Sequence, residues 1–206
     1  MVSDQATQSD IYHWCQLQQG SSAALEVLYD RYFSQLFRYG LQLITDRSLV
    51  QDVLQDFFFE LYTHHHSLSE VQQVRSYLFV CFRRKLLRSR TSNLPVVRLE
   101  EVVQPTTQSS EHSLIYSQLS EEKRKLLTRA VTKLSKRQKE AVFLRFYQEL
   151  SYEEIAAVLE LKEVKYARTL IYRSIQVLRQ QMKQYQSKLT LYSCLPLPEF
   201  LRLLKF

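Results

Sequence analysis

The chain contains very few of the residues that interrupt helices. Its 206 residues include only two glycines and four prolines, and apolar residues recur at intervals of three and four over long stretches. Glycine and proline mark turns, strand bulges and phosphate-binding loops, so their scarcity argues against a β-rich fold and against a glycine-rich phosphate loop. The sequence therefore predicts an all-α fold built from helices with one apolar side.

Cysteine pairs, long apolar runs and an export signal are also missing. The cysteines Cys15, Cys81 and Cys194 are odd in number and far apart, which favours reduced thiols over a disulfide framework. No stretch approaches the roughly 18 apolar residues of a membrane span. The start of the chain, MVSDQATQSD, lacks the basic and apolar regions of a signal peptide. These absences predict a soluble, cytoplasmic protein.

Catalytic and metal-binding motifs are absent too. We find no P-loop, dinucleotide-binding glycine pattern, nucleophile elbow or H-E-x-x-H motif, and a small helical nuclease would need a carboxylate cluster that the sequence lacks. His64, His65 and His66 are adjacent, but consecutive side chains diverge, whereas zinc ligands must converge. We interpret them as part of a loop between helices. We expect no enzymatic activity, no metal and no cofactor.

Positive charge is concentrated in two places. The formal net charge is +7, from 28 Lys plus Arg against 21 Asp plus Glu. Six bases and no acid lie between Arg75 and Arg90, and six bases against one glutamate lie between Lys162 and Lys183. Two separate basic patches predict two contacts with a polyanion such as DNA.

The second basic patch coincides with a predicted helix-turn-helix. Ser151 and Glu154 have the spacing of a capping box, which begins a short helix, and a turn is expected near residues 160–162. At 100° per residue, the next helix separates into two faces. Its apolar face comprises Val164, Ala167, Ile171, Ser174, Ile175, Leu178 and Met182.

The opposite face of this helix combines cations, amides and tyrosines. A solvated charged face is the alternative interpretation, but exposed tyrosines among cations suit the reading of a DNA groove, where the second helix of a helix-turn-helix binds. We predict base contacts by Lys165, Tyr166, Thr169 and Arg173, and a phosphate contact by Arg168. Lys162 and Tyr172 complete the predicted DNA-binding face.

A second candidate surface lies on the helix expected near residues 49–62. Its apolar side carries Val50, Val53, Leu54, Phe57, Phe58 and Leu61. Asp52, Gln55 and Asp56 lie opposite, and Phe59 lies among them. An exposed phenylalanine flanked by carboxylates favours a protein-binding face. The alternative is that Phe59 lies under a neighbouring loop.

The pattern divides the chain into four segments. Residues 1–90 form a first helical domain, 91–113 a flexible linker with Pro95 and Pro105, 114–185 a second domain ending in the helix-turn-helix, and 186–206 an apolar tail. For the tail, folding back onto the second domain, docking on another protein and binding a membrane surface all remain open.

Together these segments resemble the extracytoplasmic-function (ECF) group of bacterial sigma-70 factors. GSSAALEVLYDRYF followed by DRSLVQDVLQDFFFELY is similar to sigma region 2, and LSKRQKEAVFLRFYQELSYEEIAAVLEL is similar to sigma region 4. The resemblance implies that Asp52, Gln55 and Asp56 contact core RNA polymerase, and we expect the neighbouring exposed Phe59 to take part in that contact. It implies that the helix of residues 77–90 binds the minus-10 promoter element, and that region 4 binds the minus-35 element. The minus-10 candidates are Tyr77, Arg83, Arg84, Lys85 and Arg88.

The resemblance implies an initiation factor that binds polymerase and promoter DNA, both as duplex and as melted strand. Arg84 and Arg88 stand where the family often carries Asn and Asp, which exchanges base selectivity for phosphate attraction. This departure motivates the hypothesis that recruitment depends on an additional protein partner, with the tail as its candidate site. An anti-sigma factor is a further candidate partner. The alternative function is a free-standing helix-turn-helix regulator with a dimerisation or ligand domain.

Overall fold

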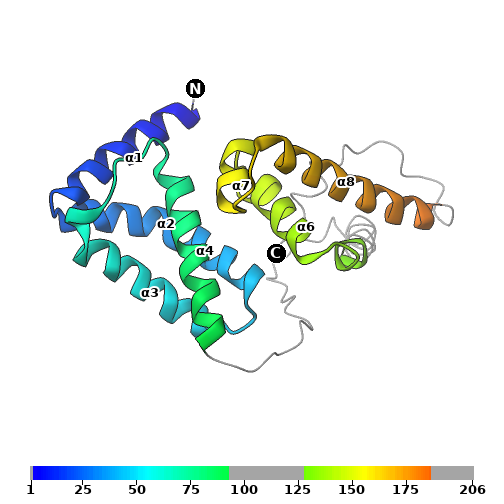
Figure 1. Cartoon of the computed structure of the whole chain (residues 1–206), viewed down its shortest axis with the longest axis horizontal. Helices are drawn as coiled ribbons and strands as arrows, with labels where there is room; N and C mark the ends of the chain where they lie inside the picture. The colour runs from blue at the N-terminus through cyan, green and yellow to red at the C-terminus, as the bar shows by residue number, and fades with distance from the viewer. Residues whose placement is uncertain (1, 93–127, 187–206) are drawn as a thin grey trace, which may run out of the picture. The chain divides into compact units, whose positions relative to one another are not determined.

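The structure, a computed structural model, describes residues 2–92 and 128–186, and every regular element within them is helical (Figure 1). The all-α prediction is confirmed. The α-helices are α1 (Val2–Gln18), α2 (Ser22–Leu43), α3 (Arg47–Thr63), α4 (Val74–Ser92), α6 (Lys136–Val142), α7 (Tyr152–Val158) and α8 (Val164–Gln186). A 3-10 turn, η1, covers His65–Ser67, and a π-helix, η2, covers Phe143–Tyr147.

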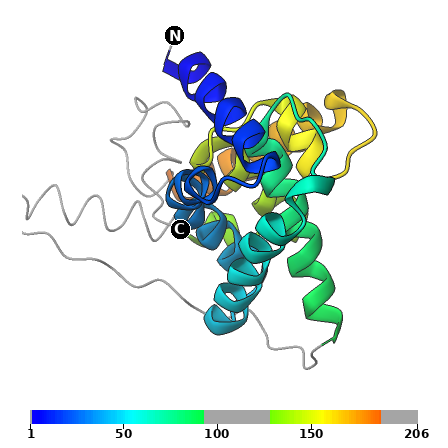
Figure 2. The ribbon, with the colours of Figure 1, turned by 90° about the vertical axis from the view of Figure 1, so that its left-hand side faces the viewer.

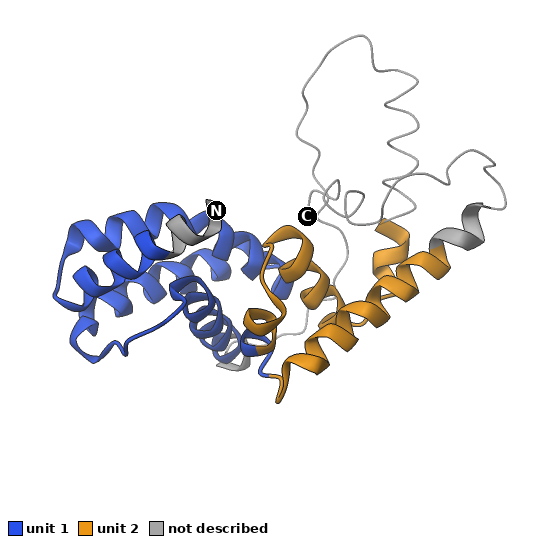
Figure 3. Cartoon of the chain, turned by 90° about the horizontal axis from the view of Figure 1, so that it is seen from above, with its two compact units in different colours: residues 1–100, 157–160 blue, residues 101–156, 161–206 orange. Residues whose placement is uncertain are grey.

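The chain divides into two compact units (Figure 3). Unit 1 comprises residues 1–100 with 157–160, and unit 2 comprises residues 101–156 with 161–206. The predicted linker, apart from its first two residues in α4, lies outside the described residues, as does the predicted tail beyond Gln186. Helix α1 begins at Val2, within a polar segment whose few apolar residues did not indicate a helix.

Unit 1 is built around α2, which packs against α1, α3 and α4 (Figure 2). Long aromatic side chains fill its interior, including the fully buried Trp14, Tyr39, Phe79 and Phe82. Gly40 lets α2 pack tightly against α3, since a Cβ at this position would lie 2.5 Å from Val50 Cγ1. Any larger residue there would force the two helices apart.

The turn between α1 and α2 requires the chain's other glycine. Gly20 has a φ of +88°, a conformation that side chains other than glycine's disfavour. Its amide donates to Leu17 O at 2.8 Å, and the amide of Ser21 donates to Gln16 O at 3.0 Å. These two bonds form a Schellman motif, which ends α1 and satisfies its last carbonyls. Ser21 then caps α2 by accepting from the Ala24 amide.

A buried carboxylate ties α1 to α2. Asp10 is 6% exposed and accepts hydrogen bonds from the Arg31 guanidinium and the Tyr32 hydroxyl. A buried carboxylate is tolerated when it is both paired and hydrogen-bonded. Burial and the neighbouring Asp10 raise the pKa of Tyr32, so the phenol stays protonated as the donor.

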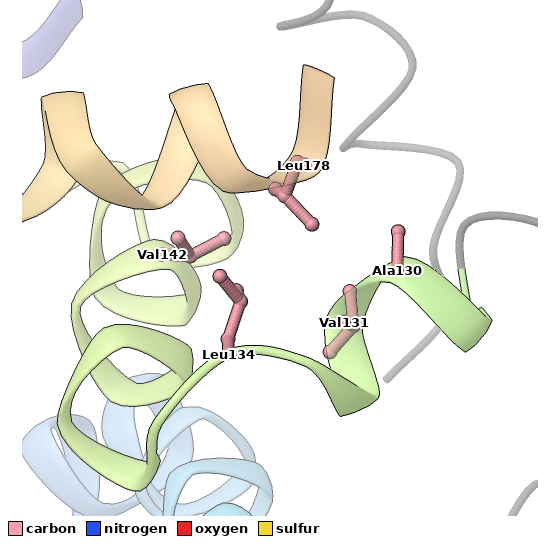
Figure 4. Packing of buried hydrophobic residues seen from close by; sticks show 5 residues of the cluster. All are labelled: Ala130, Val131, Leu134, Val142 and Leu178. Atoms are coloured by element: carbon pink, nitrogen blue, oxygen red, sulfur yellow. The ribbon is translucent and has the colours of Figure 1, made fainter. Parts of the chain in front are cut away.

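Unit 2 has a small apolar core between the segment before α6, α6 itself and α8. Ser135 begins α6 with a capping box to Gln138. Figure 4 shows five buried side chains of this core converging from these segments: Ala130, Val131, Leu134, Val142 and Leu178. Phe146 and Val177 pack against them. This cluster holds α8 against α6 along its apolar face.

Candidate nucleic-acid and polymerase interfaces

The predicted helix-turn-helix is present. The Ser151 amide donates to Glu154 Oε2 at 2.7 Å and the Glu154 amide donates to Ser151 Oγ at 3.1 Å, so the predicted capping box is confirmed. Helix α7 ends in a second Schellman motif, with Leu161 N–Ala156 O at 2.8 Å. Glu160 occupies the left-handed position of that motif with a φ of 52°. The turn therefore lies where the sequence predicts it.

Helix α8 presents the two predicted faces. Ala167, Ile171, Ser174 and Leu178 are buried. Tyr166 is 45% exposed and Tyr172 is 60% exposed, so ring surface of both tyrosines reaches solvent. The other members of the predicted DNA-binding face are also exposed: Lys162, Lys165, Arg168, Thr169 and Arg173. A shared exposed face is the geometry that entry into a DNA groove requires.

Several of these side chains already have partners within the chain. Lys165 Nζ lies 2.7 Å from a carboxylate oxygen of Glu163 and 5.2 Å from the centre of the Tyr166 ring. Thr169 Oγ1 donates to Lys165 O at 2.8 Å, which leaves its oxygen lone pairs as acceptors. To contact DNA, Lys165 would exchange the Glu163 carboxylate for a phosphate. This exchange costs little free energy, because an ion pair in solvent is weak.

Arg168 belongs to a cluster that the sequence did not reveal. Its guanidinium carbon lies 5.5 Å from the centre of the Tyr152 ring, and Nη2 lies 3.7 Å from Glu153 Oε1. The guanidinium of Arg145 lies over the same ring at 4.7 Å, and its Nη1 donates to Leu150 O at 2.8 Å. Two cations therefore lie beside one tyrosine at the start of α7, next to the predicted groove-reading face.

The π-helix η2 precedes this cluster and carries Arg145. Its wider turn is closed by a hydrogen bond from the Gln148 amide to Phe143 O, 3.1 Å long, and Glu149 follows with a φ of 55°. Helical periodicity does not forecast a π-turn, so the direction of Arg145 could not be read from the sequence.

The carboxylate of Glu153 titrates below its usual range. Its own backbone amide is the main cause of the lowered pKa, followed by the Ser151 hydroxyl and then by Arg168 and Arg145. Helix N-termini favour negative charge in this way. Glu153 therefore stays ionised at neutral pH and balances part of the positive charge of the arginines.

The acidic and aromatic side of α3 is exposed as predicted. The apolar side chains Val50, Val53, Leu54, Phe57, Phe58 and Leu61 are buried, while Asp52, Gln55 and Asp56 are exposed. Phe59 is 69% exposed, so no loop among the described residues covers it. An exposed phenylalanine flanked by carboxylates fits a protein-binding face.

The predicted minus-10 candidates on α4 differ in their surroundings. Tyr77 is half-buried, and its ring packs edge-on against Trp14 with centroids 5.1 Å apart. Lys85 Nζ forms an ion pair with Glu60 Oε1 of α3 at 2.6 Å. Arg84 and Arg88 are exposed and Arg83 is half-buried. The arginines thus remain at the surface, whereas Tyr77 and Lys85 also hold α4 in place.

The thiols and histidines of unit 1 differ in their surroundings. Cys15 and Cys81 are free, and burial raises the pKa of Cys81. The His65 ring is hydrogen-bonded to the carbonyl of Gln18, the last residue of α1. Within the described residues, no three His, Cys, Asp or Glu side chains gather as metal ligands would, and no helix there has the length and apolar content to cross a bilayer.

A helix-turn-helix with a basic, tyrosine-bearing outer face places the chain in the class of helical DNA-binding proteins. A sequence profile described as Sigma-70, region 4 matches residues 124–174. The ECF RNA polymerase sigma factor SigM of Bacillus subtilis is 24% identical over 160 residues, which cover 75% of this chain and 93% of that protein. The RNA polymerase sigma-E factor of Streptomyces avermitilis is 29% identical over 148 residues, which cover 72% and 79%.

Solved structures agree with this assignment at the level of the fold. CnrH, solved in complex with the cytosolic domain of CnrY, matches with a TM-score of 0.59 and 20% identity over 85% of this chain and 98% of that one. The sigma factor RpoE of Bartonella quintana, solved in complex with the anti-sigma factor NepR, matches with a TM-score of 0.54 and 17% identity over 77% and 96%. Residues 124–174 thus match the sigma-70 region 4 family, and the chain is similar to ECF sigma factors over about three quarters of its length.

Proposed function

We propose that this chain is a transcription initiation factor that binds core RNA polymerase and directs it to promoters through minus-10 and minus-35 contacts. The observation that carries the proposal is the presence of two exposed surfaces of different chemistry in one sigma-like chain. One is the acidic, aromatic side of α3 with Phe59 at 69% exposure, and the other is the outer face of α8. We assign the chain no catalytic step of its own, and its place of action is the cytoplasm.

In this proposal α3 holds the polymerase. Phe59 provides the apolar anchor, since buried aromatic anchors dominate the energetics of protein interfaces. Asp52 and Asp56 provide charges that steer and orient a basic partner. Gln55 lies between them on the same exposed side and completes the surface.

Helix α8 would read the minus-35 duplex. Arg173 and Lys165 carry donors for guanine edges or phosphates, Thr169 keeps acceptor capacity, and the exposed rings of Tyr166 and Tyr172 add apolar contact area. Arg168 would bind phosphate beside the groove, exchanging its exposed contact with Glu153 for the DNA backbone.

The arginines of α4 would hold the minus-10 region. Arg83, Arg84 and Arg88 provide charge along one helix, and charge of this kind attracts a nucleic-acid backbone with little regard to sequence. Tyr77 offers one half-exposed ring on which an unpaired base can stack. We therefore expect more of the sequence selectivity to come from α8 than from α4.

A protein regulator is a further proposed partner. The sigma factor RpoE of Bartonella quintana is seen in complex with an anti-sigma factor, and a similar protein would keep this chain inactive until it is needed. We also propose that recruitment involves an additional protein through residues 187–206. Deleting this segment should reduce promoter occupancy in cells, and unchanged occupancy would contradict this part of the proposal.

The central test is charge reversal on α3. The double variant Asp52→Lys with Asp56→Lys should stop the full-length chain from copurifying with core polymerase, while binding of α8 to duplex DNA persists. The matched control reverses two exposed acids on α2, Glu26→Lys with Asp30→Lys, and changes the net charge equally. Copurification should survive in the control. If it also survives in the α3 variant, α3 is not the polymerase-binding surface.

A further inference from the structure

Side chains of α1 hold the backbone of the loop that joins α3 to α4. Trp14 Nε1 donates to Ser69 O at 3.1 Å, and Gln18 Nε2 donates to Leu68 O at 2.8 Å. Trp14 is 1% exposed, so its N–H must find an acceptor within the protein. Two successive loop carbonyls are thus bound by donors from a helix about fifty residues earlier in the chain.

A side chain of the loop, His65, in turn binds a backbone carbonyl of α1. Its Nδ1 lies 3.2 Å from Gln18 O, so Gln18 contacts the loop through both its side chain and its carbonyl. The ring of His65 also lies against Gly20, where a Cβ would come within 3.0 Å of His65 Cε1. The turn that ends α1 and the 3-10 turn that ends α3 therefore fit together closely.

Trp14 also fixes the first turn of α4. Its ring meets the Tyr77 ring edge-on at 5.1 Å, and the Tyr77 amide donates to Gln73 O at 3.1 Å. Tyr77 is the residue expected to stack on an unpaired base. One buried indole thereby sets the position of the loop and of the first aromatic side chain after it.

The loop is rich in polar side chains that remain exposed. Its exposed members are His64, His66, Ser67, Ser69, Glu70, Gln72 and Gln73. Hydroxyl, imidazole and amide groups can donate to and accept from the edges of unpaired bases. Because the carbonyls of Leu68 and Ser69 are already bound to α1, the loop loses less conformational entropy when a strand binds.

We propose that Trp14 and Gln18 are positioning residues that fix the loop of residues 64–73, together with Tyr77, in the geometry that receives the unpaired promoter strand. The inference rests on the proposed function and adds a role for α1. Neither side chain touches DNA. Each acts through the loop backbone or through Tyr77.

The test compares two DNA probes bound by the complex of full-length chain and core polymerase. The first probe carries a premelted bubble and is selected from a random-sequence pool by the wild-type complex. The second is the fully paired upstream half of the same fragment. Gln18→Met removes one donor and Trp14→Phe keeps a ring without its N–H. Each should weaken bubble binding roughly two- to ten-fold, the value of one hydrogen bond, and leave duplex binding unchanged.

Two further variants separate positioning from simple destabilisation. Gln18→Lys restores a donor and should recover bubble affinity without raising duplex affinity, whereas its added charge alone would strengthen binding to both probes. Gln16→Met makes the same replacement two residues earlier on α1 and should bind both probes normally. Equal weakening on both probes, or unchanged bubble affinity in Gln18→Met and Trp14→Phe, overturns the inference.

The wild-type measurement tests the proposed function separately. If the wild-type chain forms no complex with core polymerase, or if that complex does not prefer the bubble to the duplex, the initiation role fails and the inference falls with it. If the wild type shows the preference and the variants keep it, only the positioning role is wrong.

Discussion

The turn after α1 offers a sharp prediction because one glycine meets two constraints there. We expect Gly20→Ala to destabilise unit 1. The backbone at this position has a φ of +88°, and the new Cβ would lie 3.0 Å from His65 Cε1. The substitution therefore strains the backbone and displaces the ring that is hydrogen-bonded to Gln18 O.

The magnitude follows from these two effects. Holding an alanine in the left-handed region costs about 1–2 kcal/mol. Alanine also lowers the conformational entropy of the unfolded chain, which offsets about 0.4–1 kcal/mol of that cost. Moving His65 weakens a hydrogen bond whose net value is about 1 kcal/mol. The sum predicts a loss of about 1–2 kcal/mol in the free energy of unfolding. For a domain of this size, each kcal/mol corresponds to roughly 4–8 °C in Tm.

The assay uses the chain's one tryptophan. Trp14 is buried in unit 1, so its fluorescence during urea unfolding reports on that unit. The midpoint should fall while the slope with denaturant stays constant. In a His65→Ala background the steric part disappears, and Gly20→Ala should then cost only the backbone strain. A midpoint equal to that of the wild type would refute the reasoning.

Four other positions lead to further predictions. Gly40→Ala should destabilise unit 1 by about 1–3 kcal/mol, because the new Cβ would lie 2.5 Å from Val50 Cγ1. The same urea titration measures this effect. An unchanged midpoint would mean that α2 and α3 can move apart at little cost. Arg173→Ala should cost about 1–3 kcal/mol in DNA binding, selectively for the cognate upstream sequence; an equal loss on every duplex would make Arg173 a phosphate contact. Arg88→Ala should weaken binding with little sequence preference and lower the salt slope by about 0.7 on the unpaired strand or about 0.9 on duplex DNA, as titrations at several salt concentrations would reveal. The lowered pKa of Glu153 predicts a stabilisation that is complete above its ordinary pKa of 4.5 and is lost as the pH falls through the folded-state pKa. Glu153→Gln should therefore narrow the difference in stability between neutral and acidic pH, as measured in circular dichroism melts. An unchanged difference would contradict this prediction.

Local signals in the sequence were enough to locate the helix-turn-helix and the exposed sides of α3 and α8. A capping box joins residues three positions apart, so Ser151 and Glu154 specify the start of α7 without help from the rest of the fold. Helical periodicity separates buried from exposed positions in the same way, which is why Phe59 and Tyr172 lie at the surface as predicted. The roles of these surfaces in binding polymerase and DNA remain predictions.

Other features were decided only by the tertiary structure, because they depend on contacts between segments that are distant in the sequence. The polar start of α1 carries too few apolar residues to indicate a helix, and the π-turn that directs Arg145 onto Tyr152 has no periodic signature. The hydrogen bond from Trp14 to Ser69 joins residues 55 positions apart, and no local pattern encodes such a pairing. Caps and amphipathic faces are properties of a single helix, whereas the partner of a buried donor is set by how the helices pack together.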